Sequence, residues 1–137
     1  MLNCDWSTLV PASRSSRHCC MAQRQHELIM RRFRRVVEGS PDRPLYIPEL
    51  CQAIGVSERT LRVCCQEQLG VGPKRYLQLR RLHLARRAFR AASSDAVTVT
   101  EVATRYGFWH FGRLAGEYQS LFGEPPSSTL NLNRRAE

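Results

Sequence analysis

Six cysteines are the side chains of this 137-residue chain that could bind a metal ion or form disulfides. They include two adjacent pairs and two single residues, with no C-x-x-C spacing and no histidine at zinc-finger distance. This spacing predicts neither a metal site nor any other cofactor. We expect the three that share apolar helix faces to be small buried side chains, since free cysteine is often buried. These three are Cys51, Cys64 and Cys65.

Arginine dominates the charge of the chain. Lys and Arg number 21 against 12 Asp and Glu, which gives a net charge of +9, and Lys74 is the only lysine. The planar guanidinium forms paired hydrogen bonds with phosphates and guanine edges, so this composition indicates a polyanionic partner. A genome rich in arginine codons would produce the same excess, and the count alone therefore decides little.

The positive charge is concentrated in the first two thirds of the chain. Residues 1–44 carry a net charge of +4, residues 45–92 carry +6 and residues 93–137 carry −1.

No segment approaches the roughly 18 to 20 apolar residues of a membrane span. The first residues also lack the basic start and apolar run of a secretory signal. We expect a cytoplasmic protein without a membrane partner.

Nothing in the sequence predicts an enzyme. No nucleophile stands near a plausible base and orienting residue, and no glycine-rich phosphate loop follows a strand. The acidic residues are scattered along the chain.

The first part of the chain changes from irregular to helical. Residues 1–21 show no helical or strand period, and we expect a disordered tail. From Gln23 to Glu38 apolar residues recur at steps of three and four, which predicts an amphipathic helix. Gly39 and Pro41 end it. Arginines fill its polar face, either as a solvated surface or as contacts to phosphates.

An internal repeat relates the middle of the chain to its end. The segment ELCQAIGV, Glu49 to Val56, aligns with EVATRYGF, Glu101 to Phe108, at an offset of 52 residues. Beyond the glycine the offset becomes 53, so the second copy carries one extra residue before Leu114. A repeat of this length indicates one supersecondary unit used twice.

Each copy has the pattern of a helix, a glycine turn and a second helix. In the first copy Gly55 permits the positive φ of a tight turn, and Ser57 caps the next helix. The second copy starts with a capping box from Thr98 to Glu101. Tyr46 takes the place of that threonine in the first copy, which predicts a weaker helix start there.

A long helix is predicted between the two copies, from Pro73 to Ala92. Its roughly 20 residues would span about 30 Å. Apolar residues cover more than half of its circumference, as in a helix held between two packed units. The remaining stripe consists of Arg80, His83, Arg87 and Arg90. The predicted fold is therefore all-α, with two helix-turn-helix subdomains joined by a long connector helix.

This architecture predicts binding to double-stranded DNA. The second helix of a helix-turn-helix can lie in a major groove, and successive major grooves on one face of B-DNA are about 34 Å apart. One such pattern is a weak signal, because many helical hairpins share it. Two copies with a rigid connector and a basic surface make a stronger one. The alternative is a helical module that acts through protein–protein contacts without specific DNA binding.

The chain resembles the DNA-binding domain of AraC/XylS-type bacterial transcription regulators over about residues 24–132. The resemblance rests on PDRPLYIPELCQAIGVSERTLRV, on the connector GVGPKRYLQLRRLHLARR and on VTEVATRYGFWHFGRLAGEYQSLFGEPPSS. It implies a two-motif domain that binds promoter DNA, usually as an activator contacting RNA polymerase. Many members carry an effector-binding domain before this one. Only about 22 residues precede the match, so no effector-binding domain fits there and we expect no small-molecule effector for this chain. The resemblance is to either a small stand-alone member or the C-terminal part of a longer one.

The resemblance also implies a division of the chain. We expect tails over residues 1–21 and 133–137 and the DNA-binding domain over residues 22–132. Within this domain the expected bounds are about 46–70 for the first helix-turn-helix, about 73–92 for the connector and about 98–123 for the second helix-turn-helix.

The family's contacts place the first recognition helix from Ser57 to about Leu69. Its expected DNA-binding residues are Ser57, Arg59, Thr60, Arg62, Val63 and Gln66. Arg59 and Arg62 can each bind guanine O6 and N7 or a phosphate, unless they only make the surface soluble. Val63 departs from the polar residue often found at its position and can contact only a thymine methyl group.

The second recognition helix, from about His110 to Leu121, offers fewer donors. Its expected DNA-binding residues are His110, Phe111 and Arg113, with Arg113 as the principal contact. His110 is equally well explained as an ordinary surface residue, and packing is favoured over base readout for Phe111. In the family this helix often binds phosphate or reads fewer bases, in agreement with the local charge of −1.

Overall fold

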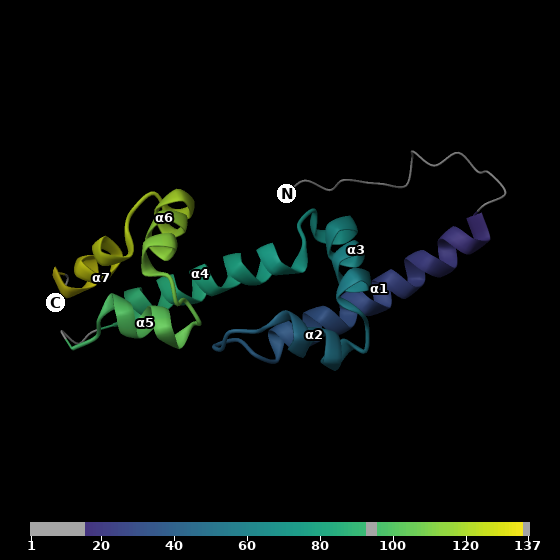
Figure 1. Cartoon of the computed structure of the whole chain (residues 1–137), viewed down its shortest axis with the longest axis horizontal. Coiled ribbons are helices and arrows are strands. Elements are labelled where there is room, and N and C mark those ends of the chain that lie inside the picture. Colours follow the sequence, from purple (N-terminus) through teal and green to yellow (C-terminus); the bar gives the residue numbers. More distant parts are fainter. Residues whose placement is uncertain (1–15, 93–95, 136–137) are drawn as a thin grey trace.

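The computed structural model describes residues 16–92 and 96–135, which form helices and no strand. These helices are α1 (Ser16–Glu38), α2 (Ile47–Ile54), α3 (Glu58–Leu69), α4 (Pro73–Ala91), α5 (Val99–Arg105), α6 (Phe111–Phe122) and α7 (Pro126–Arg135). Helices α1 to α3 form one unit and α5 to α7 form the other, with α4 running between them (Figure 1). The predicted all-α fold with two helix-turn-helix units and a long connector is confirmed.

The two ends of the described chain differ from the expectation. Residues 16–21, expected in the first tail, are helical, and α1 begins at Ser16 rather than at Gln23. The side chains from Cys20 to Gln25 are all exposed, so this part of α1 has no buried face for a periodicity search to find. Residues 1–15 of that expected tail lie outside the described residues.

Helix α7 is missing from the sequence-based prediction. It runs to Arg135 and so enters the segment 133–137 that was expected to be a tail, of which residues 136–137 lie outside the described part. Its buried residues include Pro126, Thr129 and Leu130, the last two at 3% and 4% exposure. Their spacing is helical, but only Leu130 is a strongly hydrophobic side chain, so the sequence shows little apolar periodicity there.

The first hydrophobic core lies between α1, α2, α3 and the beginning of α4. Helix α1 contributes Phe33, and α4 contributes Leu77, each 1% exposed. The Phe33 ring meets the Tyr76 ring edge to face, with centroids 5.3 Å apart. The other buried members are Ile29, Met30, Leu45, Leu50, Ile54, Leu61, Cys64 and Cys65.

The second core takes the rest of α4 and packs it against α5, α6 and α7. Phe89 of α4 lies edge to face with Tyr118 of α6, with ring centroids 5.8 Å apart. The Tyr118 hydroxyl donates to Thr129 Oγ1 at 2.9 Å, and Thr129 donates to Glu124 Oε1 at 2.6 Å. This chain of hydrogen bonds satisfies the phenol inside the core and ties α7 to α6.

The repeat found in the sequence corresponds to two similar structural units. The turn glycines Gly55 and Gly107 both have positive φ, at 80° and 77°. Ser57 is the N-cap of α3 and His110 is the N-cap of α6, so the extra residue of the second copy is Trp109. The Trp109 side chain is 71% exposed, so the insertion extends the turn into solvent and leaves the core unchanged.

The predicted capping box of the second unit is present. The Thr98 hydroxyl accepts from Glu101 N–H at 3.2 Å, and the Glu101 carboxylate accepts from Thr98 N–H at 2.8 Å. The carboxylate accepts hydrogen bonds from both the N–H and the hydroxyl of Thr98, and these lower the pKa of Glu101 because they favour its charged form.

The central cysteines are mostly core residues, as expected. Cys64 and Cys65 are fully buried, whereas Cys51 is half-buried and Cys20 is exposed on α1. Burial raises the pKa of Cys65 to about 11, with smaller contributions from Cys64 and Cys51. Within the described ranges, no group of three His, Cys, Asp or Glu side chains could hold a metal ion.

This arrangement predicts selective alkylation of the native protein near neutral pH. Cys20 is expected to react with iodoacetamide, while Cys64 and Cys65 stay unmodified, because a buried thiol of raised pKa supplies little thiolate. Peptide mass mapping after a short treatment measures the extent at each cysteine, and the same treatment in denaturant, which should label all three, is the control. Equal labelling of Cys65 and Cys20 in the native protein would show that the first core is open.

Candidate nucleic-acid interface

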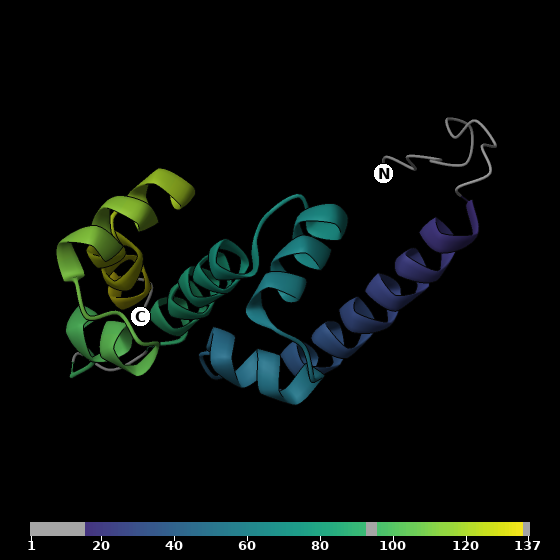
Figure 2. The ribbon, with the colours of Figure 1, turned by 45° about the vertical axis from the view of Figure 1, so that its right-hand side comes forward.

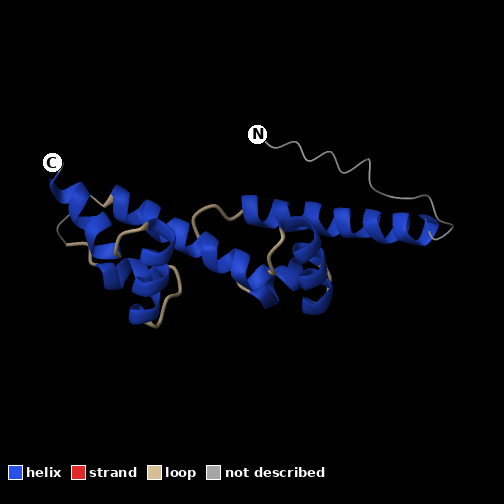
Figure 3. Ribbon diagram, turned by 90° about the horizontal axis from the view of Figure 1, so that it is seen from above, coloured by secondary structure: helices blue, strands red, loops and turns tan. Residues whose placement is uncertain are grey.

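The two helices that follow the glycine turns, α3 and α6, lie on the same side of the connector. Figure 1 shows α6 above the left part of α4 and α3 beside its right-hand end, rising above it, with α2 and α5 below. Figure 2 shows α3 beside α4 and α6 above it from another angle. Seen from above, the units are spread along the long axis of the molecule (Figure 3). Helix α4 has 19 residues and so spans about 28 Å. Two separate helices thus face one side, at a spacing set by one straight element.

The beginning of α3 is built by two of the residues predicted to bind DNA. Ser57 Oγ accepts a hydrogen bond from Thr60 N–H at 3.2 Å and lies 2.9 Å from Thr60 Oγ1. Ser57 is exposed and Thr60 is half-buried. Both therefore stabilise the first turn of the helix, whether or not they also touch a ligand.

The four outward residues predicted on α3 are all exposed in the structure. Arg62 Nη2 lies 3.4 Å from Glu58 Oε1, one turn earlier, and Gln66 Nε2 donates to the Gly70 carbonyl at 3.0 Å. Val63 is 44% exposed, between these polar groups. Arg59 makes no hydrogen bond or ion pair with any described residue, so its guanidinium is fully available.

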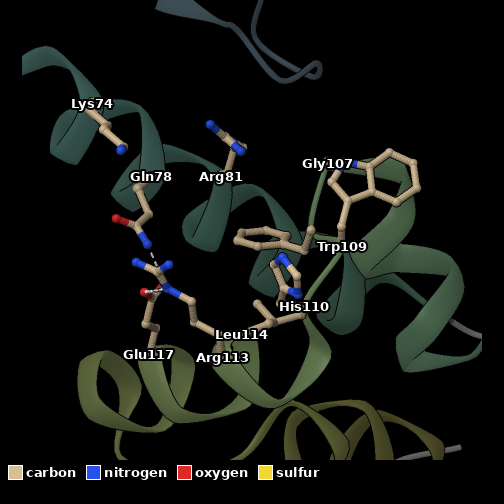
Figure 4. A pocket seen from close by; sticks show the side chains of 10 residues that line it. Lys74, Gln78, Arg81, Gly107, Trp109, His110, Arg113, Leu114 and Glu117 are labelled. Carbon is tan, nitrogen blue, oxygen red and sulfur yellow. Dashed lines mark hydrogen bonds and ion pairs between the residues drawn. The ribbon is translucent and has the colours of Figure 1, made fainter.

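The predicted residues of α6 are also exposed, but their surroundings differ. His110 is the N-cap and makes no side-chain capping bond, and the Phe111 ring is 43% exposed. Arg113 Nε donates to Glu117 Oε1 at 3.0 Å, and Gln78 of α4 donates to the other oxygen of that carboxylate (Figure 4). Glu117 therefore holds Arg113 and also links α6 to the connector.

A pocket of about 210 Å³ separates α4 from the second helix-turn-helix. Its wall combines side chains of α4 with the turn and first residues of α6, as Figure 4 shows. Four of its residues can carry positive charge, namely Lys74, Arg81, His110 and Arg113. The arrangement is suited to an anion, since the one acidic residue in the lining, Glu117, already binds Gln78 and Arg113.

Sequence reasoning missed the connector's part in this surface. Lys74, Gln78 and Arg81 line the pocket beside the predicted residues of α6. Their spacing of four and three residues places them on one face of a helix, which is a signal the sequence does contain. The predicted stripe of α4 instead began at Arg80.

That stripe has a structural role. Arg80 donates to the carbonyls of Ser40 and Arg43, and Arg87 pairs with Asp42, so both arginines hold the loop between α1 and α2. Burial lowers the pKa of Arg80. The charge of the connector is therefore only partly available to a polyanion.

One arginine of α1 also binds a backbone carbonyl of the chain itself. Arg32 Nη1 donates to the Ile54 carbonyl at 3.3 Å, at the end of α2. Arg24, Arg31, Arg34 and Arg35 are exposed, which fits either a solvated surface or contacts to phosphates.

The sequence matches a family profile described as a helix-turn-helix domain over residues 50–131. It is 40% identical over 94 residues to the "Probable thc operon regulatory protein" of Rhodococcus erythropolis, covering 69% of this chain and 28% of that protein. It is 35% identical over 105 residues to the "XylDLEGF operon transcriptional activator 2" of Pseudomonas putida, covering 74% of this chain and 67% of the relative. The matched region thus spans under a third of the first relative and two thirds of the second.

Two crystal structures have a similar fold. A probable AraC family transcriptional regulator from Rhodopseudomonas palustris superposes with a TM-score of 0.66 at 30% identity, covering 77% of this chain and 97% of the other. A regulator from Chromobacterium violaceum, described as AraC-type, has a TM-score of 0.64 at 19% identity, covering 80% and 96%. None of the described helices is long and apolar enough to cross a bilayer.

The capping bond of Ser57 leads to a prediction with two variants. Ser57→Ala should lower the free energy of unfolding by about 1 kcal/mol, because Thr60 N–H loses its acceptor. Ser57→Asp keeps an acceptor and adds a negative charge that the helix dipole favours, so it should unfold like the original chain. Urea denaturation followed by circular dichroism measures both. For affinity to duplex DNA we expect the opposite ranking, because the carboxylate of Ser57→Asp repels phosphate and this variant should bind more weakly than Ser57→Ala. If Ser57→Asp binds more tightly than Ser57→Ala, Ser57 is not part of the DNA interface.

Proposed function

Because the chain belongs to the AraC family of helix-turn-helix regulators, we propose that it binds double-stranded DNA at specific sequences and regulates transcription. The observation that carries this proposal is the placement of α3 and α6 on one side of a straight connector (Figures 1 and 2). The connector's length of about 28 Å is close to the spacing of about 34 Å between successive major grooves. Each recognition helix enters one of these grooves.

In the proposed complex, α3 supplies most of the sequence readout. Arg59 and Arg62 each present a guanidinium that can bind guanine O6 and N7 together. Gln66 can form the equivalent pair of bonds with adenine, and Val63 contacts a thymine methyl group. Ser57 and Thr60, at the start of the helix, lie where helix amides commonly meet a phosphate.

Helix α6 and the pocket beside it mainly bind the DNA backbone. Arg113 is the principal contact of α6, with His110 and Phe111 at its beginning. Lys74 and Arg81 add positive charge from the connector. The pocket lies between α4 and the second recognition helix. We therefore expect the DNA backbone that separates the two major grooves to pass over it. Phosphate contacts fix the position of the protein but carry no sequence information directly.

We further propose that the chain acts as an activator that contacts RNA polymerase. Support comes from the second relative, which is named as a transcriptional activator and is matched over two thirds of its length. We propose no enzymatic activity, no cofactor and no small-molecule effector for the part of the protein present in this chain.

The first test of DNA binding is its salt dependence. If about 5 to 8 phosphates are neutralised, the logarithm of the affinity should fall with the logarithm of salt concentration at a slope of about −4 to −7. Fluorescence anisotropy with a duplex obtained by selection from a random DNA pool measures this slope. A slope near zero, or no duplex binding at low salt, would favour the alternative of a protein–protein module.

The two recognition helices should contribute unequally. Arg62→Ala should weaken specific binding by about 1 to 3 kcal/mol and relax the base preference at one or two positions, as expected for loss of a bidentate contact. Arg113→Ala should weaken specific and random DNA more nearly alike. Arg62→Lys is the matched control, because it keeps the charge and removes the paired donors. Equal losses for Arg62→Ala on specific and random DNA would show that Arg62 binds only phosphate.

A further inference from the structure

Tyr46 occupies a position where a helix normally needs a small polar residue. It is the N-cap of α2, with extended backbone angles of −121° and 150°, and its side chain makes no capping hydrogen bond. Ser, Thr, Asp or Asn at such a position stabilises a helix by about 1 kcal/mol relative to residues that cannot cap. Tyr46 does not provide that stabilisation, so the presence of a tyrosine at this position must have another physical reason.

The ring of Tyr46 lies between the two helix-turn-helix units. The Arg81 guanidinium of α4 stands over it, with Cζ 5.3 Å from the ring centroid. The hydroxyl lies against the turn of the second unit, since a Cβ at Gly107 would come within 2.5 Å of Tyr46 Oη and 3.8 Å of Arg81 Nη1. Residues from the start of α2, the middle of α4 and the turn before α6 therefore meet at one point.

Gly107 makes this meeting possible in two ways. Its φ of 77° is a conformation that side chains rarely adopt, and the missing Cβ leaves the space that the tyrosine hydroxyl occupies. The equivalent glycine of the first unit, Gly55, has nothing within 4 Å of an added Cβ. Close packing at the turn is therefore specific to the second unit.

The loop that carries Tyr46 is held along the connector by further contacts. Arg80 binds the carbonyls of Ser40 and Arg43, and Arg87 pairs with Asp42. Arg80 and Arg87 are seven residues apart, so the loop follows α4 for about two turns. These bonds hold the loop along α4, with Tyr46 next to the turn of the second unit.

Such a contact matters because the two cores are separate. Leu77 belongs to the first core, and the next buried residue of α4, Leu82, belongs to the second. No residue of α4 between them is buried, so no packed side chains join the two cores at this stretch of the helix, and a helix without such packing can bend. The Arg81 guanidinium lies within this stretch and stacks on a ring from the first unit.

We propose that Tyr46, Arg81 and Gly107 form an inter-unit bracket that fixes the angle between the two helix-turn-helix units. Tyr46 is a positioning residue in this bracket and touches no DNA. The consequence for recognition rests on the proposed function: a fixed angle makes the protein reject DNA in which the two half-sites are spaced incorrectly. The bracket thus sets specificity for spacing, while the recognition helices set specificity for bases.

Two variants of Tyr46 separate this role from simple stability. Tyr46→Ser removes the ring and restores a capping side chain, so α2 should be as stable as before or more stable. Tyr46→Phe keeps the ring under Arg81 and is the matched control. Thermal unfolding followed by circular dichroism checks that both variants fold.

The first readout needs no DNA. Residual dipolar couplings of the backbone amides of the whole chain report the relative orientation of the two units. For the original chain and Tyr46→Phe, one alignment tensor should fit both units, whereas Tyr46→Ser should require two. A single tensor for a folded Tyr46→Ser would overturn the bracket.

The second readout is the dependence of DNA affinity on spacing. One inserted base pair between the half-sites of a selected duplex should weaken the original chain and Tyr46→Phe by about tenfold, a loss similar to that of one mismatched pair. Tyr46→Ser should lose less than about threefold, because its second unit can turn to follow the shifted half-site. Strict spacing in Tyr46→Ser, or relaxed spacing in Tyr46→Phe, would overturn the role of the ring. Failure of the original chain to bind any selected duplex would instead count against the proposed function, and the dipolar couplings would still test the bracket.

Discussion

The whole structure depends on one helix that belongs to two hydrophobic cores. Leu77 of α4 is buried with α1, α2 and α3, and Leu82, Ala85 and Phe89 are buried with α5, α6 and α7. Because all of these side chains are on one rigid helix, burying them also sets the distance between the units. A loop of the same length would connect the units without controlling their spacing. The continuity of α4 is therefore the constraint from which the geometry of the two recognition helices follows.

The distribution of charge shows that a basic composition is only partly a binding surface. Arg32, Arg80 and Arg87 bind groups of the chain itself, and they hold the loops and helix ends around α4. Of the arginines proposed to bind DNA, Arg62 pairs with the exposed Glu58 and Arg113 with the half-buried Glu117, each one turn away on the same helix. The exposed Arg62–Glu58 pair contributes little to stability, so exchanging it for a phosphate or a base costs little. Arginine count and arginine availability are thus different quantities.

The second unit is a modified copy of the first, and the modifications are concentrated at its turn. The inserted Trp109 is exposed, the N-cap of α6 is a histidine instead of a serine, and Gly107 accommodates the tyrosine of the other unit. Four buried positions of the first unit, by contrast, are also buried in the second: Leu50, Ile54, Leu61 and Cys65 correspond to Val102, Tyr106, Leu114 and Tyr118. Side chains of different volume stand at several of them, so each core is close-packed with its own set of residues. Turns and caps are free to diverge and to acquire contacts between units.

The sequence by itself determined the helices, the repeat and the outward faces of the recognition helices. Glycines of positive φ, capping residues and a period near 3.6 are local properties, and they placed α2 to α6 within one or two residues of their observed bounds. Local patterns failed for α7 and for the first turns of α1, where few strongly hydrophobic side chains are buried. Only the tertiary structure showed that Lys74 and Arg81 join the surface beside α6 and that Glu117 holds Arg113. It alone brought Tyr46 and Gly107 together across the connector. These contacts depend on how two separate cores are oriented around one helix, and no spacing along the chain encodes that angle.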